Sequence, residues 1–141
     1  MSATPALVGQ PLSYLPDVND SHTSDLLAQR GLDLLAENRP AEAADAFHAT
    51  IAADQSHVEA HHGLIRALRD AGQLDESVAA ARALIALTPD DPLAHTALSI
   101  ALQHAGDVPQ AEAAAGRARI LEWKLQLQEP ADAHPGPDST L

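Results

Sequence analysis

The fold of this chain is decided by residues 61–89, which read HHGLIRALRDAGQLDESVAAARALIALTP. Leu64 and Leu68 are four residues apart, the spacing of neighbours on one helix face. Gly72 follows, at the position just past a helix end where a left-handed residue is favoured. A second apolar helical stretch then covers residues 74–87. The sequence here predicts two short helices joined by a tight turn.

The same pattern recurs with a period of 34 residues on both sides of this stretch. An apolar position, a turn position and a small-residue position keep their register over three copies. The apolar position holds Leu34, Leu68 and Leu102, the turn position Asn38, Gly72 and Gly106, and the small position Ala43, Ser77 and Ala111. One helical hairpin cannot bury its apolar face alone, so hairpins of this kind stack on one another.

This register resembles the tetratricopeptide repeat family over about residues 24–126. The resemblance implies an all-α fold, a right-handed α-solenoid of three helix-turn-helix hairpins with an extended C-terminal helix. Helices are expected at about residues 24–37, 41–53, 57–70, 74–87, 92–105 and 108–128. Gln55 and Trp123 stand where the family closes its first and third repeats with proline, and Trp123 lets the last helix continue.

Three of the expected helix starts carry capping signals. Ser56 and Glu59 form the Ser-x-x-Glu pattern of a capping box. Asp91 directly precedes a proline. Aspartate is a preferred N-cap, and proline suits the first turn of a helix, where no backbone N–H is needed. Asp107 and Gln110 make a looser version of the box.

Composition narrows the class of protein. The net charge of −12 repels phosphate backbones and anionic lipids, so neither nucleic acid nor a membrane is expected as a partner. Cysteine is absent, which excludes disulfides and thiolate metal sites. No signal peptide, membrane span, phosphate-binding glycine loop, nucleophile elbow or catalytic triad is visible. We expect a cytoplasmic protein with no enzymatic activity and no cofactor, and the alanine- and arginine-rich usage is typical of bacteria with GC-rich genomes.

The chain is expected to divide into three parts. Residues 1–23 are an extended or flexible N-terminal segment, residues 24–128 the three-repeat domain, and residues 129–141 a disordered proline-rich tail. Residues 1–20 are apolar without a helical period. They either occupy a peptide groove, their own or a neighbour's, or form a loose tail.

In the tetratricopeptide family the first helix of each repeat lines a concave wall that holds peptides. The resemblance places nine residues in this peptide-binding groove: Ala28, Leu32, Leu35, His62, Arg66, Arg69, Thr96, Ile100 and Gln103. Arg66 and Arg69 are three residues apart, and the pair either binds a peptide carboxylate or pairs with nearby acidic residues. Those acidic residues are Asp70, Asp75 and Glu76. The carboxylate clamp of heat-shock co-chaperones is absent.

Two other clusters each allow two interpretations. His57 and His61 have the four-residue spacing of zinc ligands on a helix, but a structural role explains them without a metal, and we expect no metal site. Ile120, Trp123 and Leu127 lie on one stripe of the last helix. The stripe either forms a second interface, for a partner or a second copy, or covers the open end of the third repeat.

These features predict a protein–protein interaction module, an adaptor, assembly factor or chaperone that holds a peptide segment of a partner protein in its concave groove. The alternative is a self-assembling oligomeric scaffold, built through the N-terminal segment or the Trp123 helix. A minor alternative is a type III secretion translocator chaperone. This chain resembles those proteins in its small size, acidity and three repeats, but their amphipathic N-terminal dimerisation helix is not apparent.

Overall fold

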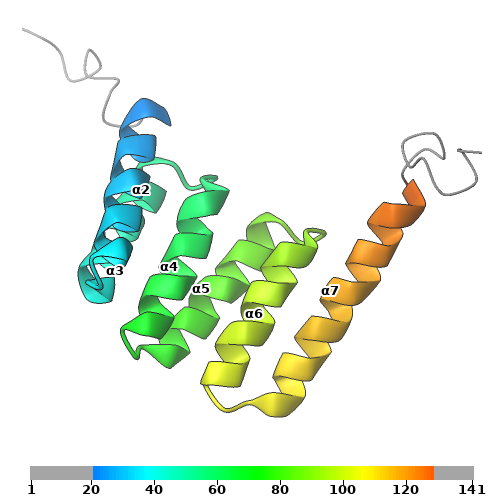
Figure 1. The fold of residues 1–141 in the computed structure, drawn as a ribbon. Helices are drawn as coiled ribbons and strands as arrows, with labels where there is room; N and C mark the ends of the chain where they lie inside the picture. The colour runs from blue at the N-terminus through cyan, green and yellow to red at the C-terminus, as the bar shows by residue number, and fades with distance from the viewer. Residues whose placement is uncertain (1–20, 129–141) are drawn as a thin grey trace, which may run out of the picture. The chain divides into compact units, whose positions relative to one another are not determined.

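The computed structural model describes residues 21–128, which form six helices and no strand (Figure 1). The helices are α2 (Ser21–Ala36), α3 (Pro40–Ala53), α4 (Val58–Asp70), α5 (Leu74–Leu87), α6 (Pro92–His104) and α7 (Val108–Gln128). They confirm the predicted all-α class. Helix α2 begins three residues earlier than expected, because the polar run at its start adopts the helix without showing an apolar period. The predictions for residues 1–20 and 129–141 lie outside the described residues.

The helices belong to two compact units, divided between Ala71 and Gly72. Unit 1 holds α2, α3 and α4, and unit 2 holds α5, α6 and α7. In unit 1, α3 packs against both α2 and α4, and in unit 2, α6 packs against both α5 and α7 (Figure 1). The two helices of the middle repeat therefore fall in different units.

The turn after the first helix of each repeat has a left-handed residue, as the sequence predicts. These residues are Asn38, Gly72 and Gly106, with φ of 61°, 81° and 88°. In the first repeat the Arg39 N–H donates to the Leu34 carbonyl at 2.9 Å. In the third, the Asp107 N–H donates to the Leu102 carbonyl at the same distance. The bonds lie two periods apart in the sequence and close the same helix-ending turn.

Two of the predicted N-caps are present. The Asp91 carboxylate accepts a hydrogen bond from the Leu93 N–H at 2.9 Å, at the start of α6. At the start of α7 the Asp107 carboxylate accepts from the Gln110 N–H at 3.2 Å, and the Gln110 side chain donates to the same carboxylate at 2.7 Å. Both acceptors satisfy N–H groups that the first turn of a helix leaves without a partner.

The predicted capping box at Ser56 and Glu59 is wrong. Helix α4 is capped by the next residue, His57, whose Nδ1 accepts from the Ala60 N–H at 3.1 Å. The Ser56 hydroxyl and N–H instead donate to the Asp54 carboxylate at 2.7 and 3.0 Å. Asp54 therefore draws Ser56 into the preceding turn and shifts the helix start by one residue.

The core of unit 1 is organised around Phe47, the only phenylalanine of the chain. Its ring comes from α3 and is 1% exposed. It lies against the backbone of Gly31 in α2 and of Gly63 in α4. A Cβ at Gly31 would lie 2.7 Å from ring carbons, and one at Gly63 would lie 2.8 Å from Cε2 and closer still to Cζ. The glycines thus provide the space that the ring fills.

Unit 2 packs mainly through small residues. Its buried apolar side chains are Ala81, Leu84, Ala94, Leu98, Ala101, Leu102, Ala111, Ala114, Ala118 and Leu121. Ser99 is in register with Gly31, two periods later, and its buried hydroxyl donates to the Ala111 carbonyl at 2.8 Å. In unit 2 a hydrogen bond thus joins α6 to α7 at the position where, in unit 1, the Phe47 ring packs against Gly31. Within residues 21–128 no helix is both long and apolar enough to cross a membrane.

We expect Gly63→Ala to lower the free energy of unfolding by about 1–3 kcal/mol, because the new methyl group overpacks the Phe47 ring. Gly116→Ala is the matched control, since a Cβ there meets nothing closer than 3.8 Å. Alanine at that helical position should stabilise by about 0.5–1 kcal/mol. Urea unfolding followed by circular dichroism measures both changes. Equal effects of the two substitutions would contradict the packing of Phe47 against Gly63.

Candidate peptide-binding pocket

Unit 1 contains a pocket of about 390 Å³ with the Phe47 ring among its lining residues. Helix α2 contributes Ala28, Leu32 and Leu35, and α4 contributes Glu59, His62, Gly63 and Arg66. The volume is in the range of small-ligand sites, and apolar surface with a few polar groups at its edge is the usual lining of such sites. This arrangement suits an apolar side chain of a bound segment, with charged groups beside it.

Five of the nine predicted groove residues line this pocket. They are Ala28, Leu32, Leu35, His62 and Arg66. Their spacing of four and three residues places each set on one face of its helix, and the α2 and α4 sets are one period apart. Arg69 is half-buried on α4 but does not line the pocket. Thr96, Ile100 and Gln103 lie on α6, in unit 2.

Three lining residues were not among the predicted groove residues: Phe47, Glu59 and Gly63. The sequence marks Phe47 only as an apolar residue of the second helix of the first repeat. Glu59 precedes Gly63 by one helical turn and His62 by three residues, so it lies on the same side of α4. That spacing is a signal in the sequence, but the capping-box pattern assigns Glu59 a different role.

The charges on α4 are partly paired within the helix. The Arg66 Nε lies 3.6 Å from an Asp70 carboxylate oxygen, and the Arg69 Nε lies 3.6 Å from the other. This is the arrangement that the sequence offered as the alternative to a peptide anchor. Both distances exceed those of hydrogen bonds, and the Arg66 side chain is 62% exposed, so these surface pairs are weak.

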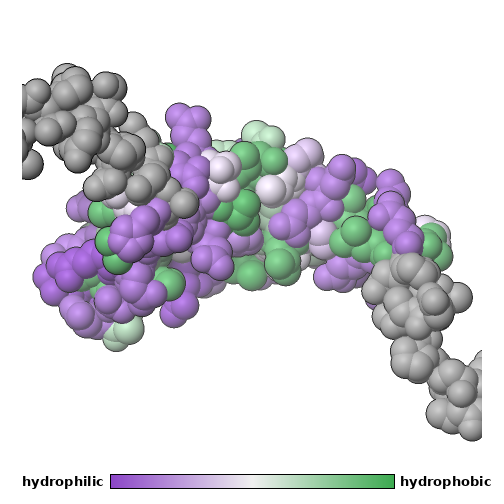
Figure 2. All heavy atoms as spheres, turned by 90° about the horizontal axis from the view of Figure 1, so that it is seen from above, coloured by the Kyte–Doolittle hydropathy of each residue, from purple (hydrophilic) through white to green (hydrophobic). Residues whose placement is uncertain are grey.

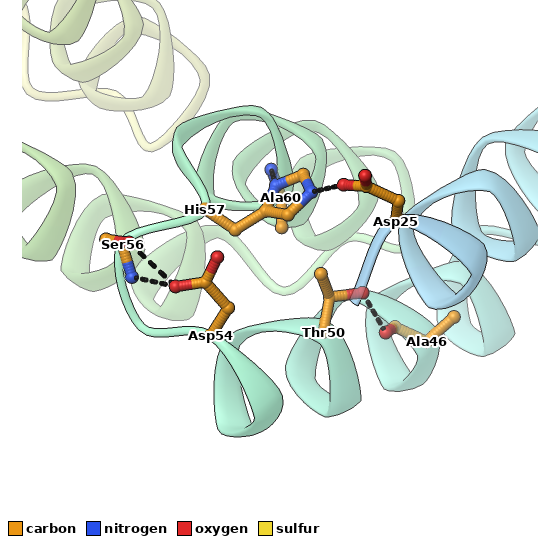
Figure 3. Close-up of polar contacts among 7 residues, drawn as sticks. All are labelled: Asp25, Ala46, Thr50, Asp54, Ser56, His57 and Ala60. Carbon is orange, nitrogen blue, oxygen red and sulfur yellow. Dashed lines mark hydrogen bonds and ion pairs between the residues drawn. The ribbon is translucent and has the colours of Figure 1, made fainter. Parts of the chain in front are cut away.

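The two walls of the pocket are joined by His57 (Figure 3). Its Nε2 lies 3.0 Å from the Asp25 carboxylate of α2, while its Nδ1 accepts from the Ala60 N–H of α4. An Nδ1 that accepts leaves the proton of a neutral imidazole on Nε2, which then donates to Asp25. One side chain, 9% exposed, thus caps α4 and holds it to α2.

Two charged groups in the turns next to the pocket have pKa values shifted by neighbours in the same turn. The hydroxyl and N–H of Ser56 donate to Asp54 and hold the pKa of its carboxyl below the usual range (Figure 3). The carboxylates of Glu42 and Glu37 raise the pKa of Arg39 at the start of α3. Both groups are exposed, and they stabilise turns rather than build a reactive site.

His61 and His95, like His57, are engaged in hydrogen bonds. His61 contacts the Gln55 carbonyl at 2.9 Å, and His95, one period later, contacts the Pro89 carbonyl at 2.8 Å. Each ring joins the first helix of a repeat to the loop before it, which is the structural role that their shared register indicates. Among residues 21–128 no group of three or more His, Asp or Glu side chains is placed to hold a metal ion.

The predicted second interface lies on α7. Ile120, Trp123 and Leu127 are exposed by 47%, 61% and 66%. Helix α7 contacts α6 through the opposite side, where Leu121 is buried. Figure 2 shows hydrophobic surface next to the end of this helix.

Family comparison agrees with the helical register. The model of the tetratricopeptide repeat matches residues 29–92 and, overlapping them, residues 62–122. This chain belongs to the tetratricopeptide repeat family. Its repeats are protein-interaction modules. A search of curated proteins gave no match to the sequence.

Solved structures with this tetratricopeptide fold share little sequence with the chain. The Yersinia enterocolitica type III secretion translocator chaperone SycD has a TM-score of 0.69 at 18% identity, over 80% of this chain and 84% of that one. SycD in complex with a peptide of the translocator YopD has a TM-score of 0.66 at 19% identity, over 72% and 78%. A structure of MamA has a TM-score of 0.70 at 19% identity, over 92% and 73%. The match to a second MamA structure spans 60% of that chain.

We expect His57→Ala to lower the free energy of unfolding by about 1–2 kcal/mol, because α4 loses its N-cap. His57→Asn should recover most of this, since asparagine caps well but does not reproduce the contact with Asp25. The exposed His48 on α3 offers the control substitution His48→Ala. Urea titrations of the three variants measure the effect, and a cost no larger than that of the control would refute the capping role.

Proposed function

We propose that this protein is an adaptor or chaperone that binds a segment of a partner protein in the unit 1 pocket. The observation that carries the proposal is the pocket itself, which has Leu32, 49% exposed, among its lining residues. An exposed leucine beside a formed pocket offers apolar area to a ligand without rearrangement of the core.

The charges at the pocket restrict the segment. Glu59 and Arg66 are seven residues apart on α4, which places them about two helical turns, or about 10 Å, apart. An apolar side chain of the segment would enter between α2 and α4. An acidic group would meet Arg66, and a basic or hydrogen-bonding group would meet Glu59.

The relatives of known structure support a peptide ligand, because one of them holds a peptide of a translocator. The resemblance to translocator chaperones is one of fold alone at this identity. A role in type III secretion is therefore the narrower proposal, and binding of a peptide segment the broader one.

The test begins with a random peptide library displayed on phage and selected on the immobilised full chain. We expect the selected peptides to bind Leu32→Asp at least about tenfold more weakly, because a carboxylate at this position opposes burial of their apolar side chain. Leu26→Asp is the matched control on the same helix, since Leu26 is 60% exposed and lies outside the pocket. Peptides that bind both variants equally well would place the site elsewhere.

Asp70 should compete with the ligand for Arg66. Asp70→Asn removes that competitor, so we expect acidic peptides from the selection to bind about two- to fivefold more tightly. Arg66→Gln should weaken the same peptides by a similar factor. Fluorescence anisotropy of the labelled peptides measures both changes. An unchanged affinity in both variants would remove Arg66 from the site and leave the apolar pocket as its only determinant.

A further inference from the structure

Helix α7 is longer than its counterparts in the other repeats. It has 21 residues, whereas α3 and α5 have 14 each. Leu121 is its last buried residue, and residues 122–128 are all exposed. The described chain thus ends in about two turns of helix without apolar burial, although they contain Trp123 and Leu127. A short helix gains most of its stability from packing, so this extension points to a partner.

Three of the exposed apolar residues of α7 continue a seam that starts at Gly116. Gly116, Ile120, Trp123 and Leu127 follow one another at spacings of four, three and four residues. This is the spacing at which two helices pack side by side in a coiled coil. The name α7 seam refers below to these four residues.

Stacking of a further repeat does not explain the α7 seam. The stacking positions of the second helix hold Ala44, Phe47 and Ile51 in α3, and Val78, Ala81 and Ile85 in α5. In the same register, α7 has Glu112, Ala115 and Arg119, and both charged residues are exposed. A polar face of this kind ends a repeat array. Ile120 corresponds instead to Ala52, which is exposed on α3.

Gly116 has no internal reason to be glycine. A Cβ there would meet only the Arg119 guanidinium, at 3.8 Å. Glycine weakens a helix relative to alanine, so its presence favours the close approach of another backbone. It lies at the end of the α7 seam where the side chains are smallest.

The charges beside the α7 seam identify the kind of partner. From Gly116 to Leu127 the positions that flank the seam hold Arg117, Arg119, Lys124 and Gln126. Three of the eight basic residues of a chain with a net charge of −12 therefore flank one apolar stripe. Glu122 lies on the opposite side of the helix.

These basic flanks disfavour pairing between two copies, because the like charges of two seams would face each other. An anionic membrane surface would face the acidic remainder of the chain as well as the seam, whereas a single helix would contact only the seam and its flanks. An acidic partner satisfies both the apolar seam and its flanks. We propose that the α7 seam binds an acidic amphipathic helix of another protein, with its apolar residues on Ile120, Trp123 and Leu127 and its carboxylates beside the flanking cations.

Trp123 is the only tryptophan, so its fluorescence reports on the α7 seam in the full chain. The probes are two synthetic helical peptides. Each has leucine at the positions of its own apolar stripe, and the positions that flank this stripe are all glutamate in one peptide and all lysine in the other. We expect the acidic peptide to shift the emission of Trp123 to shorter wavelength in a saturable way, and the basic peptide to leave it unchanged. Added salt should weaken the acidic complex.

Lys124→Glu should weaken binding of the acidic peptide about two- to fivefold and improve binding of the basic one. Arg30→Glu is the matched control, since it changes the charge equally at an exposed position of α2. Gly116→Leu should weaken the acidic peptide about tenfold or more by blocking close approach, while circular dichroism shows the helices intact.

Three results would overturn the proposal. Equal responses to the two peptides, or no response to either, exclude an acidic helix. A mass that rises with concentration and falls on Trp123→Asp assigns the α7 seam to a second copy. A fluorescence shift with phosphatidylserine vesicles but not with the acidic peptide assigns it to a membrane. The Leu32→Asp variant separates this site from the pocket, because it should bind the acidic helical peptide as the wild type does.

Discussion

The position of the Phe47 ring against the backbones of Gly31 and Gly63 is the constraint on which unit 1 depends. The ring comes from α3 and reaches both α2 and α4, so a single side chain fixes three helices. Interiors are packed closely enough that a ring of this size needs its space kept free, and two glycines keep it. The same ring lines the pocket together with Gly63, so the core contact and the candidate binding surface share these two residues. His57 at the start of α4 adds a second link between these helices, because its Nε2 contacts the Asp25 carboxylate of α2.

The helices of unit 2 are held together by smaller side chains than the Phe47 ring. At the register of Phe47 it has Ala81 and Ala115, and at the register of Gly31 it has Ser99. The helices α6 and α7 are then joined by the Ser99 hydroxyl, whose hydrogen bond to the Ala111 carbonyl keeps a buried polar group satisfied. A repeat period therefore preserves the backbone path while the side chains that hold it change. This explains why the pocket over the Phe47 ring belongs to unit 1.

Charge is distributed unevenly over this acidic chain. Its described cations lie on helices, except for Arg39, which pairs with Glu42 in the turn before α3. The pocket has Arg66 beside Asp70, and α7 has three cations along one apolar stripe. The chain therefore has two surfaces that differ in the charges around their apolar residues. The pocket offers mixed charges around an apolar space, whereas the α7 seam offers basic flanks around exposed apolar side chains.

The sequence by itself determined the six helices, the turns at Asn38, Gly72 and Gly106, and the family, because these depend on spacing and on backbone conformations that few residues adopt. It also placed Ala28, Leu32, Leu35, His62 and Arg66 on facing helices through the repeat register. Only the tertiary structure decided that Phe47, Gly63 and Glu59 complete their pocket, and that His57 rather than Ser56 caps α4. The physical reason is competition. A local pattern shows which bonds a side chain is able to make, but which one forms depends on neighbours such as Asp54 and Asp25, and Asp25 reaches His57 only when the helices pack.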